Sequence, residues 1–199
     1  MEGRDRADGA RDDEVLLADG SWGHVRRLAP GDRDGVDALV GSCSEASLYT
    51  RFFTLGRATV GRYVDHVFDE ESPGIAYVLQ RDGRIIGLAN VEPVDEETGE
   101  IAFLVADDAH GCGVATLLLE RAAEDARSAG IRWFVADVLA SNHLMLQVFA
   151  DAGFRIERRR LAGEVSVRMS TDDTSVARAA RVARQEAALA RRAGVGRSR

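Results

Sequence analysis

The sequence predicts an α/β (α+β) domain in which about seven strands are flanked by helices. Short apolar stretches of strand length alternate along the chain with stretches in which apolar residues recur at helical spacing. One change from strand to helix pattern occurs between Glu100 and Glu120, across two glycines. Asp82-Gly83 separates two apolar runs, and Asp-Gly is among the strongest short hairpin signals. Together these patterns predict a sheet with helices packed against it.

Length and composition are typical of a globular protein with one domain and two tails. The chain has 199 residues, of which 45% are hydrophobic and 30% charged. No apolar run approaches the roughly 20 residues of a membrane span, so we expect a cytoplasmic protein without a membrane partner. We divide the chain into a disordered acidic leader (1–20), the main domain (21–171) and an Ala/Arg-rich C-terminal helix or tail (172–199).

Charge and cysteine content restrict the function classes. The net charge is −7, and the acidic leader and arginine-rich tail offset each other, so the main domain is acidic. This argues against nucleic acid as a partner and favours a cationic substrate. The two cysteines, Cys43 and Cys112, have neither metal-ligand nor disulfide-framework spacing, so we expect free thiols and no metal.

The first half of the chain predicts three strands and three helices. Asp32 follows the helix-breaking pair Pro30-Gly31 and can cap the first helix, while Ser44 can cap the second, which carries residues up to Leu55. The expected strands cover 23–28, 74–80 and 84–91, and the expected helices cover 33–40, 44–55 and 59–68. The last two strands pair as the Asp-Gly hairpin.

The second half predicts four more strands and three more helices. Gly130 and Gly153 are positioned to end helices, and a turn at Ala162-Gly163 joins the final two strands. The expected strands cover 101–106, 131–139, 154–160 and 164–169, and the helices cover 114–129, 142–152 and 172–193. The last helix has a narrow apolar stripe, for which we expect a surface position: Val176, Ala180, Ala183 and Ala187.

The glycine loop His110-Gly-Cys-Gly-Val-Ala115 connects a strand to a helix. Glycines leave backbone amides uncovered at a helix N-terminus, whose partial positive charge suits a phosphate, although two glycines can also simply form a tight turn. The loop lacks the pattern of nucleotide triphosphatases and of dinucleotide-binding βαβ units. Cys112 lies at the same helix N-terminus, where a thiolate is favoured.

This loop resembles the R/Q-x-x-G-x-G/A acyl-CoA loop of the GCN5-related N-acetyltransferases, the GNAT superfamily. His110, Gly113 and Ala115 occupy the motif positions, and His110 departs from the usual Gln or Arg. Over residues 23–170 the order of elements is also similar, as is the segment from Asn142 to Phe154. The resemblance implies the GNAT fold, with a central mixed, mostly antiparallel sheet.

Two further segments are similar to one branch of this superfamily. They are Ser47-Leu-Tyr-Thr-Arg-Phe-Phe53 and the stretch from Glu100 to Asp108. The branch comprises acetyltransferase domains of bacterial protein lysine acetyltransferases that modify acyl-CoA synthetases. Such domains are often fused to a nucleotide-sensing or CoA-ligase-like domain.

The resemblance implies acetyl-CoA as co-substrate and assigns it a binding site. The loop amides would hold the pyrophosphate near His110, and the exposed backbone of one strand would pair with pantetheine. Asn142 either contacts CoA or acts as an ordinary helix cap. The expected CoA-binding residues are Phe103, Leu104, Val105, His110, Gly111, Cys112, Gly113, Val114, Ala115, Thr116 and Asn142.

Catalysis requires a base, because a lysine amine with a pKa near 10.4 is mostly protonated at neutral pH. The superfamily places a glutamate at the start of the strand before the loop, which is Glu100 here, and Glu92 is the second choice. A solvated carboxylate without a catalytic role is the alternative for Glu100. Phe149 stands where many relatives have a Tyr that protonates the leaving thiolate, so water must do so or the thiolate leaves unassisted.

Three functions are compatible with these residues. The first is acetyl-CoA-dependent acetylation of a protein lysine, with an acyl-CoA synthetase as a candidate acceptor. The second is the same reaction on a small amine such as an antibiotic, a polyamine or an amino acid. The third is a non-catalytic acyl-CoA sensor, which the changes at Phe149 and His110 would suit.

Overall fold

The computed structural model describes residues 12–53, 57–161 and 163–195. They form an eight-stranded sheet in the order β1-β2-β3-β4-β5-β6-β8-β7. The strands are β1 (Asp13–Leu16), β2 (Trp22–Arg27), β3 (Ile75–Arg81), β4 (Arg84–Pro93), β5 (Thr98–Val105), β6 (Trp133–Leu139), β7 (Ile156–Leu161) and β8 (Glu164–Ser170). The α-helices are α1 (Arg33–Ser42), α2 (Glu45–Phe52), α3 (Arg57–Val67), α4 (Val114–Ser128), α5 (His143–Asp151) and α6 (Ser175–Val195).

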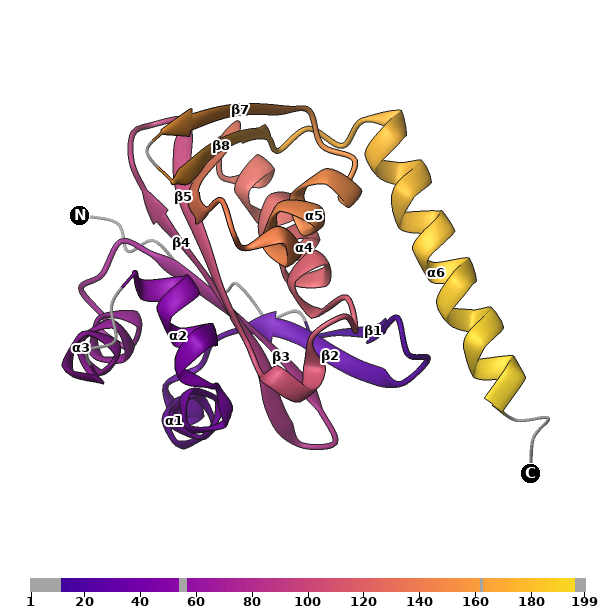
Figure 1. Cartoon of the computed structure of the whole chain (residues 1–199), viewed down its shortest axis with the longest axis horizontal. Coiled ribbons are helices and arrows are strands. Elements are labelled where there is room, and N and C mark those ends of the chain that lie inside the picture. Colours follow the sequence, from indigo (N-terminus) through magenta and orange to yellow (C-terminus); the bar gives the residue numbers. More distant parts are fainter. Residues whose placement is uncertain (1–11, 54–56, 162, 196–199) are drawn as a thin grey trace, which may run out of the picture.

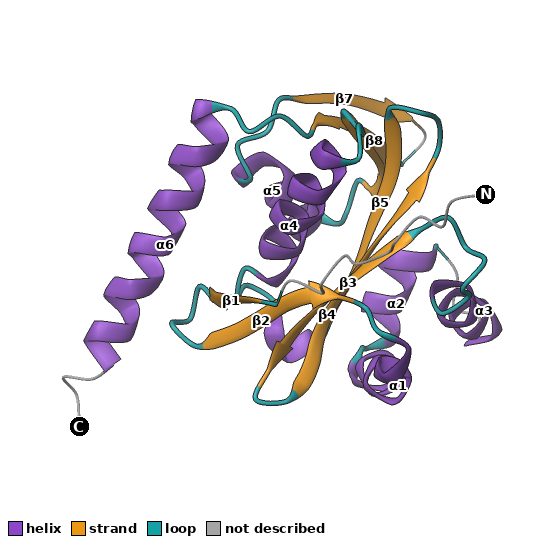
Figure 2. Cartoon of the chain, turned by 180° about the vertical axis from the view of Figure 1, so that it is seen from behind, coloured by secondary structure: helices purple, strands orange, loops and turns teal. Residues whose placement is uncertain are grey.

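The sheet is mixed and mostly antiparallel, as expected, because only β5 and β6 run parallel. Helices α1, α2 and α3 cover one side of it, and α4 and α5 cover the other (Figure 1). Helix α6 lies at the outer edge of the molecule, on the same side as α4 and α5 (Figures 1 and 2). The main core fills the space between the helices and the sheet.

Local signals in the sequence produced the expected turns and the cap of α2. The expected cap of α1 is wrong, because the Asp32 carboxylate accepts from Arg26 and from the Ala29 amide and from no amide of α1. Asp82 and Gly83 both have positive φ, 51° and 76°, as a two-residue hairpin turn of this type requires. The Ser44 side chain accepts a hydrogen bond from the Ser47 amide at the start of α2. Gly130, with φ of 89°, follows the end of α4. The expected positions of Leu55 in α2 and of Ala162 in the last turn lie outside the described residues.

The prediction of a disordered leader over residues 1–20 is wrong for its second half. Asp13–Leu16 forms β1, an antiparallel edge strand paired with β2, which raises the strand count from seven to eight. Leu17 is fully buried in the core. The acidic composition of this segment concealed a short run of apolar residues that has a buried place in the fold. Residues 1–11 lie outside the described part of the chain.

A buried group of charges connects β1 to α4. The Arg121 side chain, 6% exposed, donates from Nη1 to Asp13 at 2.7 Å and from Nε to Asp125 at 3.3 Å. Asp125 also accepts from the hydroxyl of Tyr77 and from Nε of Arg27, each at 3.1 Å. Burial raises the pKa of Tyr77, so the phenol stays protonated and acts as a donor. Since a buried guanidinium needs partners, Arg121 specifies where β1 lies.

Helix α4 packs closely on β4, which determines where its N-terminus lies. A Cβ added to Gly87 of β4 would lie 2.3 Å from a methyl carbon of Val114 and 3.0 Å from one of Leu118. Any larger residue at position 87 would therefore push the first turn of α4 away from the sheet. The absence of a side chain at one strand position allows the glycine loop to sit against the sheet.

The inward face of α6 differs from the predicted apolar stripe. Val176 is 64% exposed, whereas Ala177 and Ala188 are almost completely buried. Between them on the same face, one and two turns along, lie Arg181 and Arg184, which form ion pairs with Glu120 of α4. The apolar stripe has the expected surface position, since Val176, Ala183 and Ala187 are exposed and Ala180 is half-buried. The inward face carries long arginine side chains, with their apolar stems and charged ends.

Candidate active site

The parallel strands β5 and β6 pair over only three residues each and then diverge. The paired residues are 98–100 of β5 and 133–135 of β6. A cleft of about 840 Å³ occupies the gap. Its walls come from α2, β5, the glycine loop, the first turn of α4, β6, α5 and one residue of α6. The divergence therefore opens the middle of the sheet.

The edge of β5 that faces this gap offers backbone groups. The Ala106 amide donates to Ile86 of β4 at 3.0 Å, and backbone groups alternate in direction along a strand. By this alternation the N–H and C=O groups of Leu104 face β4, while those of Phe103 and Val105 face the gap. An extended chain could pair with the gap-facing groups as an additional strand.

The start of α4 has the geometry of an anion site. Gly111 and Gly113 have φ of 77° and 83°, a conformation that residues with a Cβ rarely adopt. Gly113 is the N-cap residue and no side chain caps the helix. The Leu117 amide donates to the Gly113 carbonyl, so the amides of residues 114–116 have no carbonyl one turn back. Residues 114–116 line the cleft, with the positive end of the helix dipole.

Cys112 differs from its neighbours and does not line the cleft. Its amide donates to the Ala109 carbonyl at 3.2 Å, its carbonyl accepts from the Ala18 amide, and its thiol contacts Asp19 Oδ2 at 3.6 Å. Burial and the Asp19 carboxylate raise the pKa of the thiol. The expectations of a thiolate and of a phosphate-binding amide at Cys112 are therefore both wrong, because the residue faces the β1–β2 turn.

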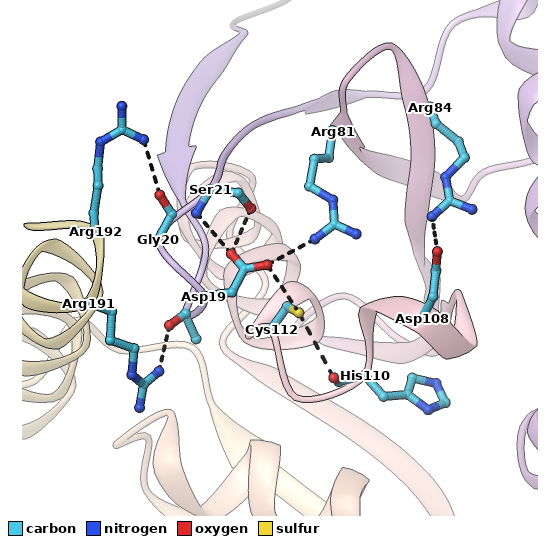
Figure 3. Close-up of polar contacts among 11 residues, drawn as sticks. Asp19, Gly20, Ser21, Arg81, Arg84, Asp108, His110, Cys112, Arg191 and Arg192 are labelled. Atoms are coloured by element: carbon cyan, nitrogen blue, oxygen red, sulfur yellow. Dashed lines mark hydrogen bonds and ion pairs between the residues drawn. The ribbon is translucent and has the colours of Figure 1, made fainter. Parts of the chain in front are cut away.

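Asp19 holds this turn against the glycine loop (Figure 3). Besides Cys112, it accepts hydrogen bonds from Ser21 and forms an ion pair with Arg81 at 3.1 Å. Burial alone would raise the pKa of Asp19, but the hydrogen bonds and the nearby Arg81 outweigh it and lower the pKa below its ordinary value. The carboxylate therefore stays ionised and the contacts that support the loop persist at neutral pH.

His110 is exposed on the cleft side of the loop. Its Nε2 lies 3.2 Å from the Val105 carbonyl oxygen, one of the gap-facing groups of β5. When this nitrogen carries a proton, it donates to that carbonyl and connects the loop to the strand edge. The backbone groups of Phe103 and the amide of Val105 remain for a ligand.

Glu100 and Glu92 lie opposite each other on β5 and β4. Glu100 is exposed and lines the cleft, and among the described residues its carboxylate has no hydrogen-bond or ion-pair partner. Glu92 is engaged, since Oε1 lies 3.1 Å from His66 Nε2 and 3.3 Å from Asn90 Nδ2. Of the two carboxylates, Glu100 is the one available to a group in the cleft.

The cleft is reached from both faces of the sheet. Glu100 shares a face with Asn90, whose Oδ1 accepts from the hydroxyl of Tyr63 in α3 at 2.7 Å. Phe103 is on the opposite face, where its ring centroid lies 6.1 Å from that of Phe149 in α5. The carboxylate therefore belongs to the α2/α3 side, and the glycine loop to the α4/α5 side.

A large part of the chain matches a known family. Residues 45–154, more than half of the chain, match the acetyltransferase (GNAT) family. The chain belongs to this family. It is therefore an acyltransferase of the N-acetyltransferase type, and the co-substrate of its family is acetyl-CoA.

Individual relatives agree with this placement. The GNAT domain of S. lividans PAT superposes with a TM-score of 0.72 at 29% identity and covers 80% of this chain and 96% of that one. Acetyltransferase Pat of Mycolicibacterium smegmatis is 26% identical over 147 residues, 70% of this chain. The chain spans only 43% of the length of this curated relative. Mycobacterium smegmatis RimJ, in complex with CoA-disulfide, shares the fold at 14% identity, with a TM-score of 0.64 and coverage of 87% and 94%.

Two residues whose roles the sequence left undecided lie at the cleft of this N-acetyltransferase. Asn142 caps α5, since its Oδ1 accepts from the Met145 amide at 3.1 Å, and it also lines the cleft. Phe149 is 1% exposed and packs beside Phe103. No tyrosine lines the cleft among the residues that the structure describes, so no phenol is available there as a proton donor.

Sequence reasoning missed two arginines that line the cleft of this GNAT enzyme. Arg51 of α2 stacks on two rings, with its Cζ atom 4.8 Å from the ring centroid of Phe52 and 4.7 Å from that of Tyr63. It belongs to the segment Ser47–Phe53, whose similarity to protein lysine acetyltransferases was noted from the sequence. Arg184 of α6 comes from a segment assigned to the tail, where no local signal marked it. Over the described residues no group of His, Cys, Asp and Glu is arranged to hold a metal, and no helix is long and apolar enough to span a membrane.

Proposed function

We propose that this GNAT enzyme transfers the acetyl group of acetyl-CoA to the side-chain amine of a protein lysine, with an acyl-CoA synthetase as a candidate acceptor. The similarity to two proteins named Pat or PAT supports the choice of a protein acceptor. So do the segments at Ser47–Phe53 and Glu100–Asp108, which resemble protein lysine acetyltransferases. The acidic main domain suits a cationic acceptor.

One observation carries the proposal: a single cleft contains an unpartnered carboxylate, an open strand edge and an uncapped helix N-terminus. The amides of Gly111, of Gly113 and of residues 114–116 would hold the pyrophosphate. Gap-facing groups of Phe103 and Val105 would pair with the amides of pantetheine. The residues present thus fit acetyl-CoA, which would supply the activated acetyl group as a thioester.

Glu100 would act as the general base from the α2/α3 side. It takes a proton from the lysine ammonium, and the free amine nitrogen then attacks the thioester carbonyl. The amide C–N bond forms as the C–S bond breaks, and the nitrogen gives its second proton to water. Phe149 has no proton to give, so water protonates the departing thiolate or the thiolate leaves as such. Acceptor and thioester thus approach the gap from opposite faces of the sheet.

The test is a comparison of acceptors with the purified chain. Thiol release from acetyl-CoA is measured with a panel of lysine peptides and a panel of small amines, and acetyl-lysine is located by mass spectrometry in acyl-CoA synthetases. Lysine-dependent thiol release supports the proposal. Release only with small amines would replace the acceptor, and binding of acetyl-CoA without release to any amine would indicate a sensor.

A further inference from the structure

One side chain in the cleft has no role in the site described above. Arg184 lies on the inward face of α6, outside residues 45–154 that match the family. Its guanidinium donates a hydrogen bond to the carboxylate of Glu120 in α4. Glu120 lies one helical turn after Thr116, which belongs to the anion site. One turn corresponds to a rise of about 5.4 Å. Arg184 therefore lies just beyond the place where the proposed pyrophosphate site ends.

Two partners hold the guanidinium of Arg184 in place. Nη2 donates to the carboxylate of Glu120, and Nη1 donates to the Asp151 carbonyl at 2.7 Å. The Glu120 side chain is only 10% exposed and that of Arg184 is 31% exposed. A guanidinium has five N–H donors, so these two bonds leave others for a ligand in the cleft. The side chain is oriented before any ligand arrives.

The local charge balance leaves room for an anion. Glu120 lies between Arg184 and Arg181, whose Nε is 3.6 Å away, so one carboxylate faces two guanidinium groups. Asp173 lies 3.6 Å from Arg181 and 3.1 Å from Arg178, so the group has three arginines and two carboxylates. Asp151 is also among the residues that line the cleft, but it is exposed, so its charge is screened by water.

The glycine loop itself lacks strong cations. The chain contains no lysine, and from His110 to Thr116 the sole basic side chain is His110. CoA carries a pyrophosphate and, one ribose ring away, a 3′-phosphate that is a dianion near neutral pH. Backbone amides can satisfy the pyrophosphate, but a phosphate monoester prefers an arginine. In the described part of the chain, Arg51 and Arg184 are the arginines that line the cleft, and Arg51 is on the Glu100 side.

We propose that Arg184 binds the 3′-phosphate of acetyl-CoA, which makes α6 part of the co-substrate site. This rests on the acetyl-CoA site of the proposed function. Arg184 would contact only the 3′-phosphate of CoA. The protein should therefore bind CoA more tightly than dephospho-CoA, which lacks that group and is otherwise identical. The contact is charge-assisted, so the discrimination also weakens as salt concentration rises.

The experiment measures the affinity of the full chain for acetyl-CoA and acetyl-dephospho-CoA by calorimetry. The wild type should bind acetyl-CoA about tenfold more tightly. Arg184→Gln should lose about tenfold affinity for acetyl-CoA while its affinity for the dephospho compound stays the same, so that the ratio approaches one. Arg184→Lys should retain part of the preference. Arg191→Gln is the matched control, since Arg191 is exposed on the same helix, bonds to the Ala18 carbonyl and does not line the cleft, and its ratio should equal that of the wild type.

The outcomes separate the possible errors. An unchanged ratio in Arg184→Gln, or no preference in the wild type, overturns the proposal. Equal weakening of both ligands also overturns it, because Arg184 would then act only by holding α6 against Glu120. If the wild type binds neither compound, the acetyl-CoA site of the proposed function has failed as well.

Discussion

The Glu100→Gln variant tests the proposed chemistry most directly. The substitution keeps the size and hydrogen-bonding capacity of the side chain and removes its ability to accept a proton. Removing a positioned general base costs about 10²–10⁴-fold in rate, and a hundredfold loss corresponds to roughly 2.7 kcal/mol of barrier. We expect a loss of this size in turnover at saturating acetyl-CoA.

The structure predicts that nothing else changes in this variant. Glu100 is exposed and has no partner among the described residues, so the free energy of unfolding should change by no more than about 0.5 kcal/mol. Acetyl-CoA affinity should be unchanged, because backbone groups of β5 and α4 provide the proposed contacts. Calorimetry and thermal unfolding measure these two quantities, and thiol release measures turnover.

A matched control comes from the facing strand. Glu92→Gln makes the same change opposite Glu100 and disturbs the contact with His66, so it should leave turnover within about threefold of the wild type.

The reasoning would be refuted if Glu100→Gln kept more than about a third of wild-type turnover at saturating acetyl-CoA. Less than about 1 kcal/mol of barrier would then depend on this carboxylate. A large loss in Glu92→Gln together with a small one in Glu100→Gln would move the base to Glu92. Small losses in both variants would leave water as the proton acceptor.

Three further variants test the proposed phosphate site at the glycine loop, the absence of a general acid at Phe149, and one ion pair. Gly113→Asp forces an aspartate to φ of 83° and places a negative charge at the proposed phosphate site. Calorimetry should therefore show acetyl-CoA affinity reduced more than tenfold, about 1.4 kcal/mol. An unchanged affinity in a folded protein would contradict the assignment of the phosphate to the glycine loop. Phe149→Tyr adds a hydroxyl in a 1% exposed position, which costs about 1–3 kcal/mol of stability if it finds no partner, and turnover should be maintained or raised; a folded but much slower variant would show that the position is occluded. Asp32 accepts two hydrogen bonds from Arg26, at 2.6 and 2.8 Å, which outweigh burial and lower its pKa below 3.8. Its contribution to stability is therefore complete above about pH 4 and is lost as the pH falls through the lowered pKa. In denaturant unfolding, Asp32→Asn should cost about 1–3 kcal/mol at pH 7, and the difference from wild type should shrink below pH 4; a constant difference would rule out the ion pair as its source.

Local features of the fold could be predicted from the sequence because they depend on neighbouring residues. The Asp82-Gly83 turn and the helix cap at Ser44 each arise from the conformational freedom or hydrogen bonding of one or two side chains. The left-handed conformation of Gly113 at the start of α4 is of the same kind. Apart from β1, the helices and strands predicted from such patterns lie within a few residues of their observed bounds.

Gly153 shows where local reasoning stops. Its φ of 78° fits the predicted end of α5. A Cβ at this position would also lie 2.9 Å from the Cα of Ala177, because α6 passes directly over the turn. The first reason depends on a few adjacent residues, whereas the second involves a helix more than twenty positions later in the chain. Only the folded structure contains the second reason.

The sequence by itself determined the order of the elements from β2 onward, the turns, the caps of α2 and α5 and the glycine loop, since these follow from periodicity and from the backbone preferences of adjacent residues. Tertiary structure alone decided that β1 is a strand held by Arg121, and that Cys112 turns to Asp19 and away from the cleft. It also decided that Arg184 reaches the cleft from the tail. In each case a charged or polar side chain finds its partner on an element far away in the chain. Burial and pairing set the energy of such a contact, and neither is a property of the local sequence.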